Sequence, residues 1–89
     1  MLSIYQVCLQ LVRDLRPYVL QIAKFDPDLA RQLKKAMTAS PLNVAEGSGS
    51  RAGRRRHCYD TALSETRETL ACLEVAEAAG YIQIGRAHV

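Results

Sequence analysis

Aromatic and β-branched residues are scarce in this chain of 89 residues. Tryptophan is absent, phenylalanine occurs once, and valine and isoleucine are few beside alanine and leucine. Because aromatic and β-branched residues favour strands while alanine and leucine favour helices, the composition predicts an all-α protein. A single domain of this length buries only roughly 60–65% of its unfolded surface, so we expect a partner surface as well.

Paired cysteine spacings and long apolar runs are missing too. Cys8, Cys58 and Cys72 follow neither a disulfide framework nor a zinc-binding pattern. No apolar run is long enough to span a bilayer, and the N-terminus lacks the order of basic, apolar and small residues found in signal peptides. We therefore expect reduced, mostly core thiols in a cytoplasmic protein, and neither a metal nor a cofactor.

Acidic residues are absent from one basic segment, residues 47–57, although the chain beyond it is acidic. The four arginines of this segment are Arg51, Arg54, Arg55 and Arg56. This segregation is more informative than the net charge of +3.

Apolar residues recur at spacings of three and four in three stretches, which predicts helices over residues 4–24, 27–47 and 55–79. The expected inner faces are Ile4, Cys8, Leu11, Leu15, Tyr18 and Ile22 in the first helix, Leu29, Leu33, Ala36, Met37 and Ser40 in the second, and Tyr59, Ala62, Leu63, Thr66, Leu70, Leu73 and Ala76 in the third.

Prolines and glycines indicate where these helices start, bend and end. Pro17 either kinks the first helix or divides it in two, and Pro41 is expected to bend the second. Asp26 and Pro27 suit the N-cap and the first position of the second helix, and Gly80 suits the position just past the third. The break between the second and third helices is assigned to Gly47, Gly49 and Gly53.

Asn43 and Glu46 stand three residues apart near the end of the second helix, so they share a face. Their neighbours are apolar, and a carboxylate or an amide buried there must be hydrogen-bonded. The spacing admits two interpretations: a structural polar pair that holds this helix against the third, or a frayed and solvated helix end.

Several short motifs together resemble a known family. They are Gln32-Leu33-Lys34-Lys35-Ala36, the run Ser40-Pro41-Leu42-Asn43-Val44-Ala45-Glu46-Gly47-Ser48-Gly49, Ala62-Leu63 with Arg67-Glu68, and Gly80-Tyr81. Over nearly all of residues 4–82 the chain is similar to the four-helix-bundle proteins first noticed as products of intervening sequences in bacterial large-subunit ribosomal RNA genes.

The resemblance implies an up-and-down helical bundle of the four-helix-bundle family, assembled into a pentameric ring. One branch, the accessory variability determinants of diversity-generating retroelements, binds a reverse transcriptase and nucleic acid through a basic surface. For most other members no activity is established. This chain departs from the family in two respects: only three helices are fully present, and Ser64-Glu65 stands where the family often has Gly-Ser.

The last six residues have a different character. Ile84-Gly85-Arg86-Ala87-His88-Val89 is similar to the translation of a short-read sequencing adapter. We therefore predict a single helical-bundle domain over residues 1–83 and a non-native tail over residues 84–89, which removes His88 from consideration as a ligand.

Three catalytic interpretations have little support. The glycine-rich segment 47–53 follows no strand and matches no nucleotide fingerprint. Glu46 with His57 lacks a nucleophile or a second carboxylate, and the adjacent His57 and Cys58 are weak evidence for an activated thiol. We expect no enzyme and no catalytic residues.

The arginine-rich segment is the main candidate for function. Guanidinium groups bind phosphates, and a helix that starts near Arg54 adds free amides and a positive dipole end. We predict nucleic-acid binding, to RNA or DNA, by Arg51, Arg54, Arg55, Arg56, Lys34 and Lys35. In a ring this patch would repeat with the symmetry. The alternative is a solvated loop whose arginines serve solubility or pair with a neighbouring subunit.

Two functions therefore stay open. The first is a non-catalytic, oligomeric accessory protein that binds nucleic acid, with a reverse transcriptase or another protein as a further partner. The second is a protein-interaction scaffold ring that has no role with nucleic acid. Contacts to phosphate weaken steeply with salt and an apolar docking surface does not, so salt dependence distinguishes them.

Overall fold

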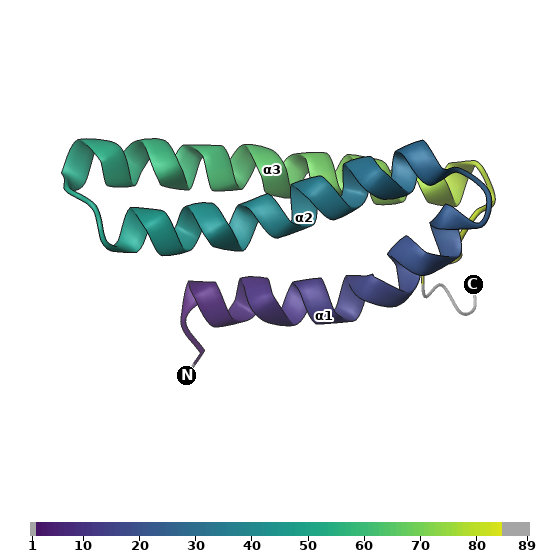
Figure 1. The fold of residues 1–89 in the computed structure, drawn as a ribbon, viewed down its shortest axis with the longest axis horizontal. Helices are drawn as coiled ribbons and strands as arrows, with labels where there is room; N and C mark the ends of the chain where they lie inside the picture. Colours follow the sequence, from purple (N-terminus) through teal and green to yellow (C-terminus); the bar gives the residue numbers. More distant parts are fainter. Residues whose placement is uncertain (1, 85–89) are drawn as a thin grey trace.

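The computed structural model describes residues 2–84, and these form three α-helices without a strand: α1 (Ile4–Ala23), α2 (Pro27–Ser48) and α3 (Ala52–Ala78). The expected all-α fold is confirmed. Figure 1 shows an up-and-down arrangement in which α2 and α3 form an antiparallel hairpin and α1 doubles back along α2. Apart from Ile84, the predicted tail lies outside the described residues. None of these helices is long and apolar enough to cross a membrane.

The first two helices begin at side-chain caps. Ser3 and Gln6 form a capping box, in which the Gln6 amide donates to Ser3 Oγ at 3.1 Å and the Ser3 amide donates to Gln6 Oε1 at 2.9 Å. The Leu29 amide donates to Oδ1 of Asp26 at 3.0 Å, and Pro27 follows the cap. The predicted start of α2 is confirmed, whereas the capping box of α1 was not predicted.

The end of α3 is closed by a Schellman motif. Gly80 has a φ of 84°, the left-handed conformation that glycine adopts without strain. The Tyr81 amide donates to the Ala76 carbonyl at 2.9 Å and the Gly80 amide donates to the Glu77 carbonyl at 3.0 Å. The place predicted for Gly80 is confirmed. Beyond it, the Tyr81 ring stacks on Phe25 at 5.4 Å between centroids.

The helix boundaries and interruptions differ from the prediction in three respects. The first helix continues through Pro17, so its division into two pieces is wrong. The third helix begins at Ala52 rather than at residue 55, after Arg51 in extended backbone with φ −71° and ψ 163°. Gly47 and Gly53 consequently lie inside α2 and α3, and only residues 49–51 separate these helices.

The core is concentrated at the end of the molecule where α1 turns into α2 and α3 ends. Its fully buried members include Ile22 and Leu33. The buried cluster consists of Leu15, Ile22, Ala30, Leu33, Met37, Cys72, Ala76 and Ile82. At the other end the N-terminal half of α1 contributes no buried residue, and Ile4 and Leu11, expected inside, are exposed.

The inner face of α3 was predicted only in part: Ala62 and Ala76 are buried and Leu73 packs against the core, as expected. Tyr59, Leu63, Thr66 and Leu70 are exposed, although they are among the apolar or large residues of this helix. The buried residues of α3 are small: Cys58, Ala62, Thr69, Cys72 and Ala76. They face small residues of α2, which include Ala36, Ser40 and Gly47. Because the two helices approach closely, only small side chains fit between them.

Candidate nucleic-acid interface

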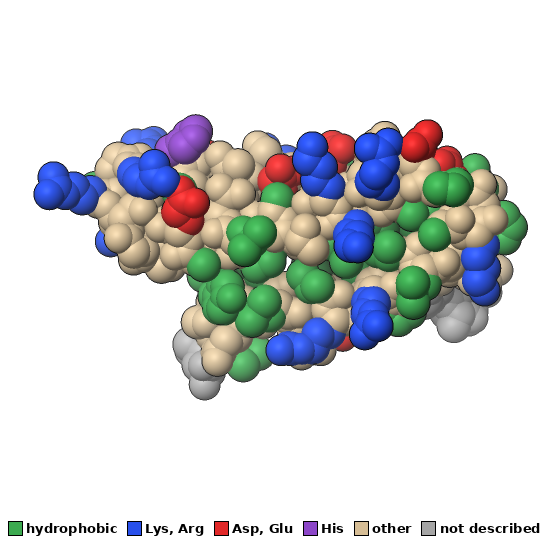
Figure 2. All heavy atoms as spheres, viewed as in Figure 1, with side chains coloured by type: hydrophobic (Ala, Val, Ile, Leu, Met, Phe, Trp, Pro, Cys, Tyr) green, Lys and Arg blue, Asp and Glu red, His purple; other side chains and the backbone are tan. Residues whose placement is uncertain are grey.

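The arginine-rich segment forms the start of α3 rather than a loop. Arg51 is the N-cap, and Arg54, Arg55 and Arg56 follow within the first turns of the helix. All four side chains are exposed. Figure 2 shows Lys and Arg side chains gathered at the end of the molecule where α2 joins α3. The first turn of α3 has neither an acidic residue nor a side-chain cap, so its positive end adds to the field of the arginines.

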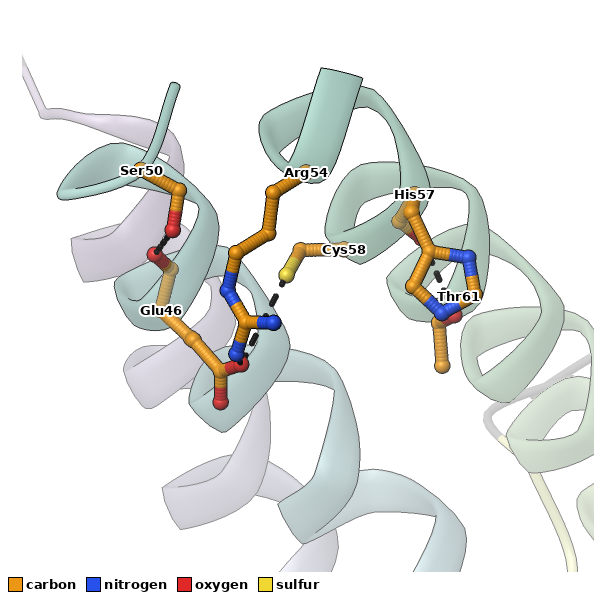
Figure 3. A network of polar contacts seen from close by, with 6 residues as sticks. All are labelled: Glu46, Ser50, Arg54, His57, Cys58 and Thr61. Carbon is orange, nitrogen blue, oxygen red and sulfur yellow. Dashed lines mark hydrogen bonds and ion pairs between the residues drawn. The ribbon is translucent and has the colours of Figure 1, made fainter. Parts of the chain in front are cut away.

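Two of the arginines already have partners. Arg54 forms an ion pair with Glu46 of α2 (Figure 3), and Nη2 of Arg55 donates to the Ser50 carbonyl at 3.2 Å. Glu46 is the one acid in this part of the described chain that is ion-paired with an arginine of the segment. We call this cluster of four arginines, with Glu46 beside it, the arginine end.

Glu46 connects α2 to α3 through this ion pair, and its side chain is 52% exposed. Its carboxylate also lies 3.9 Å from Sγ of Cys58, and its backbone carbonyl accepts from Ser50 Oγ at 2.7 Å. An exposed ion pair contributes about 0–1 kcal/mol, less than the roughly 1–3 kcal/mol expected of a buried carboxylate. The pair therefore orients Arg54 without fixing it strongly.

Asn43 and Glu46 do not bond to each other within the described residues. Asn43 is partly buried, and its Nδ2 donates to the Ala39 carbonyl one turn earlier in α2, at 2.9 Å. Glu46 instead reaches across to α3. The two polar side chains share a region of α2, yet each satisfies its hydrogen bonds separately.

Gly47 brings the two helices together at the arginine end. A Cβ atom at this position would lie 2.8 Å from Cε1 of Tyr59 and 3.0 Å from Cβ of Cys58. Such distances are shorter than van der Waals contact, so a side chain here would push α3 away. The missing Cβ of Gly47 is what allows the preceding Glu46 to reach Arg54.

His57 and Cys58 point to different sides of α3. Figure 3 shows the imidazole beside Thr61, whereas Sγ of Cys58 faces Glu46. Cys58 is buried and His57 is exposed, so the imidazole does not lie against the thiol. Within residues 2–84, no group of three or more His, Cys, Asp or Glu residues could hold a metal ion.

Lys34 and Lys35 lie apart from the arginine end. They precede Glu46 by about three turns of α2, which separates them by roughly 17 Å along the helix. Lys35 borders a shallow hollow together with Glu65 and Glu68 of α3. Lys35 therefore lies on a surface of mixed charge, and the structure does not bring either lysine together with the four arginines.

An apolar groove opens beside the arginine end, and sequence reasoning did not predict it. It encloses about 380 Å³ between all three helices. Its lining consists of Ile4 and Cys8 of α1, Ser40 and Val44 of α2, and Tyr59, Ala62, Leu63 and Thr66 of α3. Among these, the Ser40 and Thr66 hydroxyls bond to each other at 2.9 Å. We call this feature the α1–α3 groove.

Comparisons of the chain with protein-family models, curated proteins and solved structures find no match. The likeness to the four-helix-bundle proteins rests on the motifs described above and stays a prediction.

Proposed function

We propose that this protein is a non-catalytic, oligomeric helical-bundle accessory protein that binds a nucleic-acid backbone through its arginine end. The observation that carries the proposal is the placement of Arg51, Arg54, Arg55 and Arg56. All four are exposed at the cap and first turns of one helix, with a single weakly paired carboxylate among them.

Phosphate is the chemistry that fits this end best. Guanidinium groups present planar forks of donors that match phosphate oxygens, and an uncapped helix start favours negative charge. Phosphates carry no sequence information, so the binding should be largely independent of base sequence, on RNA or on DNA. Lys34 and Lys35 would contribute only to a nucleic acid long enough to reach along α2.

The exposed apolar residues around the α1–α3 groove support self-association as part of this proposal. Ile4 and Leu63 line it and are 62% and 51% exposed. Contiguous apolar surface of this kind marks interaction sites in soluble proteins. Together with the resemblance to four-helix-bundle proteins, it supports a homo-oligomer, which by that likeness would be a pentameric ring. A ring would repeat the arginine end around its axis and enlarge the positive field.

The test compares three proteins for binding to short RNA and DNA duplexes across a salt series. The first is the intact chain, and the second replaces Arg51, Arg54, Arg55 and Arg56 by Gln. The third is a matched control that removes the same charge elsewhere by replacing Arg13, Arg16, Lys24 and Arg67, all exposed, with Gln. For each arginine–phosphate interaction that a variant removes, the slope of log affinity against log salt should flatten by about 0.7–0.9.

A flattened slope in the arginine-end variant, with the control close to the intact chain, would support the proposal. Equal affinities and slopes for the intact chain and the arginine-end variant would contradict it. A Lys34→Gln, Lys35→Gln variant tests whether these lysines share the interface, since only a long duplex should detect their removal.

The α1–α3 groove favours one alternative, a protein-interaction scaffold without a nucleic-acid role. Its partner would be another protein, such as a reverse transcriptase, that covers apolar side chains. Binding through this groove should change little with salt, whereas binding through the arginine end should weaken steeply.

A further inference from the structure

The four arginines differ in what they already contact. Arg54 is ion-paired with Glu46, and its guanidinium faces α2 (Figure 3). The side chains of Arg51 and Arg56 form no hydrogen bond or ion pair within residues 2–84. A phosphate that approaches the arginine end therefore meets two free guanidinium groups and two that already have partners, Arg54 with Glu46 and Arg55 with the Ser50 carbonyl.

Building on the nucleic-acid proposal above, we infer that Glu46 competes with phosphate for Arg54 and makes the arginine end selective for polyanions over single phosphate ions. The carboxylate belongs to the same chain and lies beside Arg54. A partner on a short tether acts at an effective concentration in the millimolar range. Free phosphate ions at a concentration below the millimolar range therefore do not displace Glu46 from Arg54.

A nucleic-acid backbone reaches Arg54 by another route. Once Arg51 and Arg56 hold two phosphates, the neighbouring phosphates are also tethered beside Arg54, at an effective concentration comparable to that of Glu46. A bidentate guanidinium–phosphate contact can then replace an exposed ion pair. The exchange requires only the Glu46 side chain to move, since its backbone carbonyl has a separate partner, Ser50 Oγ, at 2.7 Å.

The close approach at Gly47 makes the competition a property of the fold. Glu46 and Arg54 are eight residues apart and lie on different helices. They meet because the space next to Gly47 is filled by Tyr59 and Cys58 of α3. The carboxylate is thereby kept at the arginine end, where it screens one of the four positive charges.

The inference is tested with the full chain and its Glu46→Gln variant, using inorganic phosphate and a short duplex as separate probes. Removing one negative charge about 5 Å from a bound phosphate should tighten duplex binding about fourfold. In a phosphate titration followed by NMR, Arg54 should respond at a lower phosphate concentration in Glu46→Gln than in the intact chain. Glu74→Gln is the matched control, because it removes a charge from the same helix as Arg54 roughly 30 Å away, beyond the Debye length of about 10 Å.

A double-mutant cycle separates competition for Arg54 from the general effect of removing a negative charge near the bound phosphates. We expect Arg54→Gln to weaken duplex binding several-fold more in the Glu46→Gln background than in the intact chain, because Arg54 is then free for phosphate. Equal duplex affinities of Glu46→Gln and the intact chain, or equal effects of Arg54→Gln in both backgrounds, would overturn the inference. Failure of the quadruple Arg→Gln variant to lose binding would instead overturn the proposed function itself. The two failures are therefore distinguishable.

Discussion

Gly47 of α2 packs against the ring of Tyr59 of α3 so closely that an added Cβ would lie 2.8 Å from Cε1. Tyr59 is held at this place by its hydroxyl, which lies 3.3 Å from Ser48 Oγ. The contact determines how near the two helices come at the arginine end. It can be probed without touching any charged residue.

Gly47→Ala should destabilise the protein by about 1–3 kcal/mol, because α3 or the tyrosine ring must move to admit the methyl group. Gly53→Ala is the matched control: no atom lies within 4 Å of its Cβ position, and it too lies in a helix. There we expect a gain of up to about 1 kcal/mol from alanine's higher helix propensity. Thermal unfolding followed by circular dichroism measures both, and equal melting temperatures for the two variants would refute the close contact.

Gly80→Ala should cost about 1–2 kcal/mol for a different reason. The space around Gly80 is open, but its φ of 84° is strained for any residue with a Cβ. The destabilisation would come from the backbone alone, and Gly80→Asn should recover part of it, since asparagine tolerates this conformation. A Gly80→Ala protein as stable as the original in a denaturant titration would show that the Schellman motif does not form.

The three thiols should react at different rates. Cys8 is partly buried while Cys58 and Cys72 are buried, so a thiol reagent should modify Cys8 first. Cys8→Ser should then remove the fast phase. A fast phase that persists in Cys8→Ser would contradict the packing of α3 against α2.

The stability of the protein should fall at alkaline pH in part because of Cys72. Burial raises the pKa of this thiol, and the negative charge of Glu68 raises it further. The folded state therefore keeps a proton that the unfolded state releases. This contribution is fully present below the ordinary pKa of a cysteine and is lost as the pH rises through the raised pKa. Cys72→Ala should show a shallower decline of unfolding free energy over that range, whatever its stability at neutral pH.

Self-association should depend on the α1–α3 groove. Replacing Ile4 and Leu63 with Gln should weaken it while leaving helicity unchanged, because both side chains are already exposed. Leu20→Gln is the control: Leu20 is 61% exposed on α1 and does not line the groove. Sedimentation velocity at micromolar concentration measures the result, and a well-folded monomer of the intact chain would contradict the prediction.

Local signals predicted most of the fold. The proline and aspartate at the start of α2 and the glycine after α3 have defined conformational preferences, so the boundaries of the first two helices and the end of the third agree within one residue with the structure. The start of α3 was missed because Arg51 is an unusual N-cap without a side-chain bond. Cys58, Thr69 and Cys72 of the inner face of α3 were missed because periodicity was assessed mainly from large apolar residues, whereas α2 leaves room only for alanine, cysteine and threonine.

The candidate site was predictable only in part. The cluster of arginines is visible in the sequence as a run of charge. The pairing of Arg54 with Glu46 cannot be recognised in the sequence, because it depends on how closely α2 and α3 approach each other next to the turn that joins them. The α1–α3 groove was not predictable for a similar reason, since it results from α1 lying against α2 and leaving Tyr59 and Leu63 uncovered.

The buried cluster lies at one end of the bundle and the arginines lie at the other. Hydrogen exchange should therefore be graded along the molecule, with the slowest amides around Leu33 and Ala76 and faster ones near Arg54. Changes to the exposed arginines would then leave the global unfolding free energy almost unchanged, in contrast to changes at the buried Gly47. During evolution, the number and spacing of these arginines, and the partner that they bind, could therefore change repeatedly without compensating stabilising substitutions in the core.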